Sequence, residues 1–257
     1  SLDQGRIDGQ LAPTCWIAWA DAVAQTEGRD QMKNAAKTVS DLGCLAGAAR
    51  NILVTGLAVD SRAVRPGYLF AALPGLQVHG ADYISAALAL GATSILTDAA
   101  GVRRARSTLD GAKGICVWIS EDPRQALAAA AALWFGAQPD TMVAVTGTNG
   151  KTSVASFVRQ IWTEMGHSAI NLGTNGVLGA WQAPLTHTTP EPITLHDTLS
   201  RAQAAGVTHA ALEASSHGLQ QRRLDGTYLK AAAFTNFTQD HLDYHANFAD
   251  YFAAKSG

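Results

Sequence analysis

Hydrophobic and polar positions follow a regular pattern from about Asn51 onward. The short apolar runs ILVTGLAVD, SILTD and ICVWIS predict strands. The segment DSRAVRPGYLFAAL predicts a polar turn and a further strand, and DYISAALALG predicts a helix that ends at Gly91. Residues 1–50 show only a short helical pattern in WIAWADAVA and stay poorly assigned. We therefore expect alternating strands and helices that begin near residue 51.

A helix with marked ends is predicted after ICVWIS. Asp122 can cap it, Pro123 suits the first helical position, and Gln125 lies three residues after the cap. Its alanine-rich body ends at Gly136, and the polar segment QPDT that follows predicts a connection. We place a domain boundary near 138–141, which gives an N-terminal domain over 1–139 and a central domain over 140–257.

The second half of the chain opens with the strand MVAVT, a glycine-rich turn and an amphipathic helix that Gly166 ends. The apolar positions of this helix recur at helical period: Val154, Phe157, Val158, Ile161, Trp162 and Met165. Two more apolar strands, HAALEA and AAAFTN, follow, with a helical stretch before the first. This alternation predicts an α/β fold with a parallel sheet covered on both faces.

Composition narrows the class of protein. The 257 residues are 47% hydrophobic. Their formal net charge is -2, so the overall charge of the protein does not attract nucleic acid or an anionic membrane. No apolar run approaches the roughly 18–20 residues of a membrane span. The polar N-terminus lacks the basic segment and following apolar segment of a secretory signal. Widely spaced Cys15, Cys44 and Cys116 predict buried, reduced thiols. We expect a cytoplasmic monomer without nucleic-acid partners or membrane insertion.

The strongest chemical signal is TGTNGKTS at residues 146–153, between a strand and a helix. Glycines let backbone N–H groups turn inward toward a phosphate, and the helix N-terminus adds its dipole. Lys151 can reach the terminal phosphates and Thr152 can ligate Mg²⁺. Val145 stands where the common P-loop has glycine, which disfavours a generic kinase or GTPase. We expect ATP to contact this loop: Gly147, Thr148, Asn149, Gly150, Lys151, Thr152 and Ser153.

The GTNGKT loop resembles the ATP loop of the Mur ligase and folylpolyglutamate synthetase superfamily. Further segments, in order, are similar to the Mur ligase family and within it to the MurE branch. They are DSRAVRPGYLFAALPG at 60–75, HTTPEP at 187–192, EASSHGLQQRRLDG at 213–226 and FTNFTQDHLDYH at 234–245. The resemblance runs from about residue 51 to 255. It implies an N-terminal UDP-binding domain, a truncated P-loop-type ATPase domain, and an absent C-terminal ligase domain.

The resemblance also implies substrate contacts. Ser61 and Arg62 match the segment that holds the uridine nucleotide, and Thr188 and Thr189 match threonines that meet the UDP-MurNAc portion. Three residues match positions around the muramoyl-peptide and its phosphates: Ser215, Gln221 and Arg223. Arginine suits this task because its fork pairs with phosphate or carboxylate through two bonds. The sequence leaves open whether Arg222 or Arg223 points inward, and whether His217 packs, caps or functions.

Metal ligands are expected beside the phosphate loop. Glu213 follows a predicted strand, where ligand sites of open α/β sheets gather, and can offer Mg²⁺ an oxygen ligand. By resemblance, Asn236 and His241 lie near the ATP phosphates and a second Mg²⁺. Lys255 in YFAAK matches a lysine that CO₂ converts to N6-carboxylysine. The expected metal ligands are Thr152, Glu213, His241 and carbamylated Lys255, and the expected catalytic residues are Lys151, His241 and Lys255. Asp240, Asp243 and His245 could equally make local caps and turns.

The implied reaction is amide formation in two steps. ATP phosphorylates the terminal carboxylate of UDP-MurNAc-L-Ala-D-Glu, and the amine of meso-diaminopimelate or L-lysine then displaces phosphate from the acyl phosphate. Alternatives are another Mur ligase such as MurF, whose N-terminal segment is similar, or a folylpolyglutamate synthetase. A further alternative is that the chain alone binds nucleotide and UDP-sugar without catalysing ligation.

Overall fold

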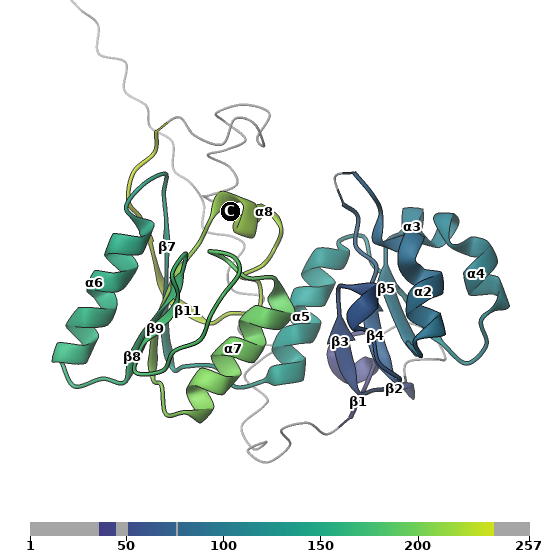
Figure 1. The fold of residues 1–257 in the computed structure, drawn as a ribbon, viewed down its shortest axis with the longest axis horizontal. Coiled ribbons are helices and arrows are strands. Elements are labelled where there is room, and N and C mark those ends of the chain that lie inside the picture. Colours follow the sequence, from purple (N-terminus) through teal and green to yellow (C-terminus); the bar gives the residue numbers. More distant parts are fainter. Residues whose placement is uncertain (1–35, 45–50, 76, 239–257) are drawn as a thin grey trace, which may run out of the picture. The chain divides into compact units, whose positions relative to one another are not determined.

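The computed structural model describes residues 36–44, 51–75 and 77–238 (Figure 1). Three sheets lie in this part of the chain, and the two larger ones lie on either side of the segment 136–140 in sequence. The first contains four parallel strands in the order β3 (Gly56–Ala58), β4 (Tyr68–Ala71), β5 (Ser94–Thr97) and β6 (Cys116–Ile119). A separate antiparallel pair joins β1 (Lys37–Thr38) to β2 (Leu53–Val54). The run ILVTGLAVD, which we expected to be strand-like, is therefore divided between two sheets.

Short helices surround the first sheet, and one longer helix follows it. The 3-10 helices are η1 (Ser40–Leu42), η3 (Ser61–Ala63) and η4 (Gly80–Tyr83). The α-helices are α2 (Ile84–Ala89), α3 (Ala99–Arg104), α4 (Arg106–Gly111) and α5 (Pro123–Phe135).

The start of α5 confirms the predicted cap. Asp122 Oδ1 accepts hydrogen bonds from the backbone N–H groups of Arg124 at 3.2 Å and Gln125 at 3.1 Å. Pro123 occupies the first turn, and Gly136 caps the other end with a φ of 73°. These contacts satisfy N–H groups that the helix itself leaves unpaired, so the local sequence fixes where α5 begins.

Two of the three cysteines fall among the described residues, and both are buried thiols outside any disulfide, as we expected. Cys44 and Cys116 belong to the apolar cluster that α5 helps to close. Burial raises the pKa of the Cys116 thiol to about 11, so the thiol stays protonated at neutral pH. Cys15 lies outside the described residues.

The second sheet has the order β11–β7–β10–β8–β9 and confirms the parallel arrangement predicted for this half of the chain. Only β9 runs antiparallel to its neighbour. Its strands are β7 (Thr141–Thr146), β8 (Ala169–Gly173), β9 (Gly176–Gly179), β10 (His209–Glu213) and β11 (Leu229–Phe234). Its helices are α6 (Lys151–Glu164), α7 (Pro192–Ala204) and α8 (Ser216–Gln220).

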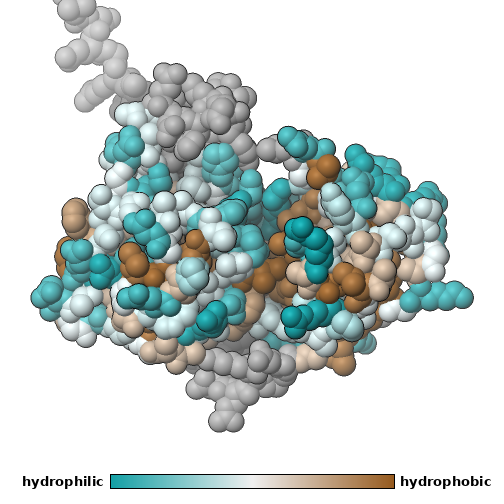
Figure 2. All heavy atoms as spheres, viewed as in Figure 1, coloured by the Kyte–Doolittle hydropathy of each residue, from teal (hydrophilic) through white to brown (hydrophobic). Residues whose placement is uncertain are grey.

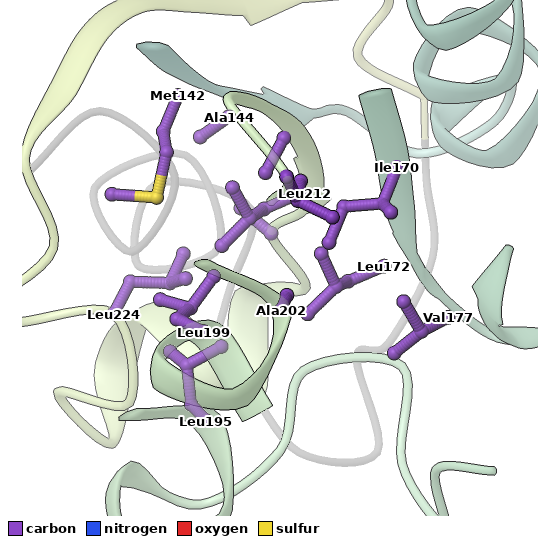
Figure 3. Packing of buried hydrophobic residues seen from close by; sticks show 13 residues of the cluster. Met142, Ala144, Ile170, Leu172, Val177, Leu195, Leu199, Ala202, Leu212 and Leu224 are labelled. Carbon is purple, nitrogen blue, oxygen red and sulfur yellow. The ribbon is translucent and has the colours of Figure 1, made fainter. Parts of the chain in front are cut away.

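Helices cover both faces of the second sheet. On one face, Leu195 and Leu199 of α7 point toward Leu172 and Leu212 of the strands, as Figure 3 shows. On the other face, Val145 of β7 packs in a cluster with residues of α6. Because side chains alternate along a strand, neighbouring residues of β7 serve opposite faces. Among the described residues, no helix is long and apolar enough to span a bilayer.

Only half of the apolar face predicted for α6 packs against the sheet, and that half is partly buried. Val154, Val158 and Trp162 pack against the sheet. Phe157, Ile161 and Met165 are 60%, 59% and 65% exposed. Hydrophobic residues, drawn in brown, lie over α6 at the left edge of Figure 2. The period identified the helix correctly, but it could not show that this face is too wide for the sheet beneath it.

Candidate active site

The phosphate loop spans residues 147–150, between the end of β7 and the start of α6. Gly150 is the N-cap of α6 and has a φ of 83°, a conformation that glycine adopts without steric cost. Gly147 has a φ of 137°, and a Cβ at this position would lie 2.0 Å from Thr235 Oγ1. These two glycines therefore allow the loop to turn tightly at the N-terminus of α6.

The chain that leaves β11 holds this loop from the side. Asn236 Oδ1 accepts from the backbone N–H of Asn149, and Asn236 Nδ2 donates to the carbonyl of Asn149, each at 3.0 Å. Thr148 and Thr238 exchange two hydrogen bonds of 3.0 Å. Because β11 pairs in parallel with β7, their carboxyl ends meet at this edge. Asn236, expected beside the ATP phosphates, thus supports the loop with both ends of its amide.

Lys151 folds back over the loop. Its Nζ donates to the carbonyls of Gly147 and Thr148, each at 2.9 Å. Both acceptors are neutral, so a phosphate oxygen would be a stronger partner for the ammonium group. Ser153, the last expected ATP contact, is exposed on the first turn of α6.

Glu213 ends β10 and is only 2% exposed. Its Oε2 accepts from Thr152 Oγ1 at 2.8 Å, and its Oε1 accepts from the N–H of Thr174 at 3.2 Å. Within the described part of the chain, no Lys, Arg or His forms an ion pair with this carboxylate. A buried carboxylate without a cation is costly, so a bound cation would relieve it.

The residues around Glu213 fit Mg²⁺ well. Mg²⁺ prefers oxygen ligands and usually takes one or two carboxylates from the protein, with water and substrate phosphates completing its shell. Thr152 and Glu213 supply such oxygens. The described residues contain no group of three or more His, Cys, Asp or Glu that could hold a metal by itself. The predicted ligands His241 and Lys255 lie outside the described residues.

The predicted substrate residues lie against the same strand end. Thr189 is 1% exposed, and its hydroxyl donates to the carbonyl of Glu213 at 2.8 Å and accepts from the N–H of Ser215 at 3.0 Å. Thr188 Oγ1 lies 2.9 Å from Thr174 Oγ1. Thr188 is partly exposed, whereas Thr189 is buried and holds the turn after β10.

Arg223 and Arg222 point to different places. Arg223 Nη1 donates to the carbonyl of Thr189 at 2.7 Å, and its Nη2 donates to Gln221 Oε1 at 2.8 Å. Arg222 has a φ of 58°, and its Nε donates to Asp122 Oδ2 at 3.1 Å. The arginine that faces the site is Arg223. Ser215 uses its hydroxyl to cap α8 by accepting from the N–H of Gly218 at 3.0 Å.

One cleft of about 550 Å³ brings most of these residues together. Its lining includes residues of the phosphate loop and several of the residues predicted to contact substrate: Thr148, Asn149, Gly150, Lys151, Thr152, Thr174, Thr186, His187, Thr188, Thr189, Glu213, Ser215, His217 and Arg223. Sequence reasoning missed Thr174, Thr186 and His187 as site residues. Thr174 follows β8 in the segment GTNG, where position in the sheet rather than local pattern brings it to Glu213.

Ser61 and Arg62 do not line this cleft. They lie in η3, which follows β3 in the first sheet. Arg62 pairs with Asp60 at 2.7 Å, and its hydrogen bonds hold the pKa of the Asp60 carboxyl at about 2. The pair is exposed, so its guanidinium can exchange Asp60 for another anion at small cost.

Two family models match the chain in succession. The model of the Mur ligase family catalytic domain matches residues 53–135, and that of the Mur ligase middle domain matches residues 145–257. Together they cover the four-stranded sheet and, from the last two residues of β7 onward, the second sheet.

Curated relatives agree with these matches. A UDP-N-acetylmuramoyl-L-alanyl-D-glutamate--2,6-diaminopimelate ligase from Brucella melitensis is 49% identical over 81% of this chain and 42% of the relative. The enzyme of the same name from Caulobacter vibrioides is 50% identical over 80% of this chain and 42% of its own length. The chain thus spans about two fifths of the relatives' length.

Solved structures show the same fold. A UDP-N-acetylmuramoyl-L-alanyl-D-glutamate--2,6-diaminopimelate ligase superposes with a TM-score of 0.70 at 28% identity, over 86% of this chain and 44% of that one. A MurF from Acinetobacter baumannii superposes with a TM-score of 0.54 at 15% identity, over 88% of this chain and 46% of that one. The second likeness concerns the fold alone.

Proposed function

Because this chain belongs to the Mur ligase family, we propose that the whole protein is an ATP-dependent ligase of cell-wall precursor synthesis. It adds a diamino acid to UDP-MurNAc-L-Ala-D-Glu through an acyl phosphate. Both relatives are named as diaminopimelate ligases, which supports diaminopimelate rather than lysine as the added residue. A cytoplasmic location and a monomeric state remain predictions.

The observation that carries this proposal is the shared cleft. Lys151 and the loop amides line one part of it, Thr152 and Glu213 lie beside them, and Arg223 lines another part. A ligase of this type must hold the terminal phosphates of ATP against the carboxylate that they phosphorylate. A single cleft with a phosphate loop and an arginine fork provides both binding functions.

The residues of this chain act mainly by positioning and by neutralising charge. Lys151 exchanges its loop carbonyls for the β- and γ-phosphates, and the loop N–H groups bind the same oxygens. Thr152 and Glu213 would hold Mg²⁺, which would supply positive charge against the phosphates. In this proposal His241 and a carbamylated Lys255 complete the metal sites, and Asn236 keeps the loop in shape.

On the substrate side, Arg223 pairs with a phosphate or carboxylate of the UDP-linked dipeptide, and Gln221 orients its guanidinium. Thr188 lines the cleft with a partly exposed side chain, and Ser215 lies at the N-terminus of α8. Ser61 and Arg62 bind the uridine nucleotide from the first sheet. Thr189 serves these contacts by holding the backbone on both sides of Ala214.

The test is ligation by the purified whole protein, with UDP-MurNAc-dipeptide compared against UDP-MurNAc-tripeptide. We expect amide product from the dipeptide and diaminopimelate only. Preference for the tripeptide would assign the protein to the MurF reaction instead. Lys151→Ala should lower turnover by about 10²-fold or more, because it removes one preorganised charge. Near-normal turnover of that variant would refute the role of the loop. The chain of 257 residues should bind without forming product.

A further inference from the structure

The turn between β8 and β9 lies directly beside Glu213. Leu172 of β8 pairs with Leu212 of β10, so the next residue along β8, Gly173, is the neighbour of Glu213. Gly173 also pairs with Gly176 across the β8–β9 hairpin, which leaves Thr174 and Asn175 as its two turn residues. The hairpin therefore ends at the carboxylate that the proposed function uses.

Gly173 leaves the space that the carboxylate occupies. A Cβ at this position would lie 1.7 Å from Oε1, 2.3 Å from Cδ and 2.7 Å from Cγ of Glu213. Its φ lies outside the left-handed region, so the backbone conformation by itself admits any residue. Glycine is therefore needed at position 173 because the Glu213 side chain occupies the space of a Cβ, and not because of the backbone conformation of the turn.

Thr174 supplies the complementary contacts. Its backbone N–H donates to Glu213 Oε1 at 3.2 Å, and its hydroxyl lies 2.9 Å from that of Thr188. Together with Thr152, which donates to Oε2 at 2.8 Å, the hairpin fixes both carboxylate oxygens. The same turn thus touches the metal side and the substrate side of the cleft.

We propose that Gly173 is a positioning residue: it makes room for the Glu213 carboxylate in the one orientation that Thr152 and the N–H of Thr174 hold for a divalent cation. This inference rests on the proposed function, because it assigns a role through Glu213. It predicts that any side chain at position 173 acts by displacing that carboxylate, and that its effect disappears when the carboxylate is removed.

A double-mutant cycle tests this dependence. Gly173→Ala, Glu213→Ala and the double variant of the full chain are titrated with Mn²⁺ in the presence of ADP, and bound Mn²⁺ is measured by electron paramagnetic resonance. Gly173→Ala should weaken Mn²⁺ binding by about 10- to 100-fold, the range found when a residue that orients a metal ligand is lost. The double variant should bind no more weakly than Glu213→Ala. Gly111→Ala is the matched control, because a Cβ there meets nothing within 4 Å.

Thermal unfolding without metal provides a second reading. Gly173→Ala should lower the melting temperature in the native background and change it little in the Glu213→Ala background, where the clashing atoms are gone. Should Gly173→Ala fail to fold, recovery of the fold in the double variant would itself support the proposal.

The outcomes that overturn the inference are distinct from those that overturn the function. If Glu213→Ala weakens Mn²⁺ binding but Gly173→Ala does not, or if the two losses add, the role of Gly173 is refuted and the metal site stands. If Glu213→Ala leaves Mn²⁺ binding unchanged, the proposed metal site fails, and the inference fails with it.

Discussion

Thr152 Oγ1 lies 2.8 Å from Glu213 Oε2, and this contact joins the first turn of α6 to the end of β10. The two residues are 61 positions apart in the sequence. Their meeting follows from the parallel sheet, which brings the carboxyl ends of β7 and β10 to one edge. Ligand sites of open α/β sheets form at such edges, so the contact ties the phosphate loop to the buried acid.

Removal of the Thr152 hydroxyl should destabilise the metal-free protein. Thr152→Val leaves Glu213 Oε2 without its donor, and we expect the free energy of unfolding to fall by about 1–3 kcal/mol. Urea denaturation in the presence of a chelator measures this change. Thr152→Ser keeps the hydroxyl and should stay within about 1 kcal/mol of the native protein, as small changes without lost partners do. Equal stability of the valine variant and the native chain would show that the contact contributes nothing.

Gly226 offers a test of packing beside α5. It has a φ of 84°, and a Cβ there would lie 2.7 Å from Ala132 Cβ and 3.1 Å from His196 Nε2. We expect Gly226→Ala to lower the free energy of unfolding by about 2–4 kcal/mol, from the overpacking and the left-handed backbone together.

Gly206 is the control for Gly226, because its φ is 86° and a Cβ there meets nothing within 4 Å. Gly206→Ala should cost only the backbone strain, about 1–2 kcal/mol. Equal losses in the two variants, measured by urea denaturation, would contradict the packing argument.

Stability should also depend on pH through His196. This side chain is 2% exposed, and its Nε2 lies 3.1 Å from the carbonyl oxygen of Asp225. Burial lowers the pKa of His196 below its ordinary value, although the Asp225 carbonyl opposes the shift. In the unfolded chain the pKa of this histidine is about 6.5, so the unfolded chain takes up the imidazole proton at a higher pH than the folded protein does. We therefore expect the free energy of unfolding to fall as the pH drops through that value toward the folded pKa.

His196→Gln removes this titration but keeps a side-chain donor for Asp225. The difference in unfolding free energy between the native chain and this variant should change between pH 7.5 and 5.5, with the native chain losing more. Burial also lowers the pKa of His209, so the comparison of variants is needed to isolate His196. Parallel pH curves for the two proteins would rule out the assigned role.

Local sequence signals predicted much of this fold. Asp122 and Pro123 marked the start of α5, and the TGTNGKTS segment marked the strand, turn and helix around Lys151. In these cases the residues that determine the structure are neighbours in the chain. Resemblance to a family then predicted substrate contacts, and two of the predicted residues, Thr188 and Arg223, line the same cleft as the loop.

The remaining features depend on contacts between distant segments. No residue near Gly173 in the sequence indicates that a carboxylate 40 residues away occupies the space where a Cβ would lie. That contact follows from the register of β8 and β10. Likewise, Asn236 and Thr189 look like ligand contacts in sequence, and only the structure shows their hydrogen bonds to Asn149 and Ser215. Polar residues that stabilise a site and polar residues that contact a ligand are of the same amino-acid types, so a sequence pattern does not distinguish them.

The most direct test of the central claim is calorimetric titration of this chain with UDP-MurNAc-L-Ala-D-Glu, and separately with ATP and Mg²⁺. Arg223→Ala is compared with Arg222→Ala, because the neighbouring Arg222 points to Asp122 instead of the cleft. We predict saturable binding of both ligands, with affinity for the UDP compound reduced by about 10- to 100-fold in Arg223→Ala only, as expected for a lost hydrogen bond to a charged group. Binding of ATP without the UDP compound, or equal affinity in Arg223→Ala and the native chain, would contradict the proposed substrate site.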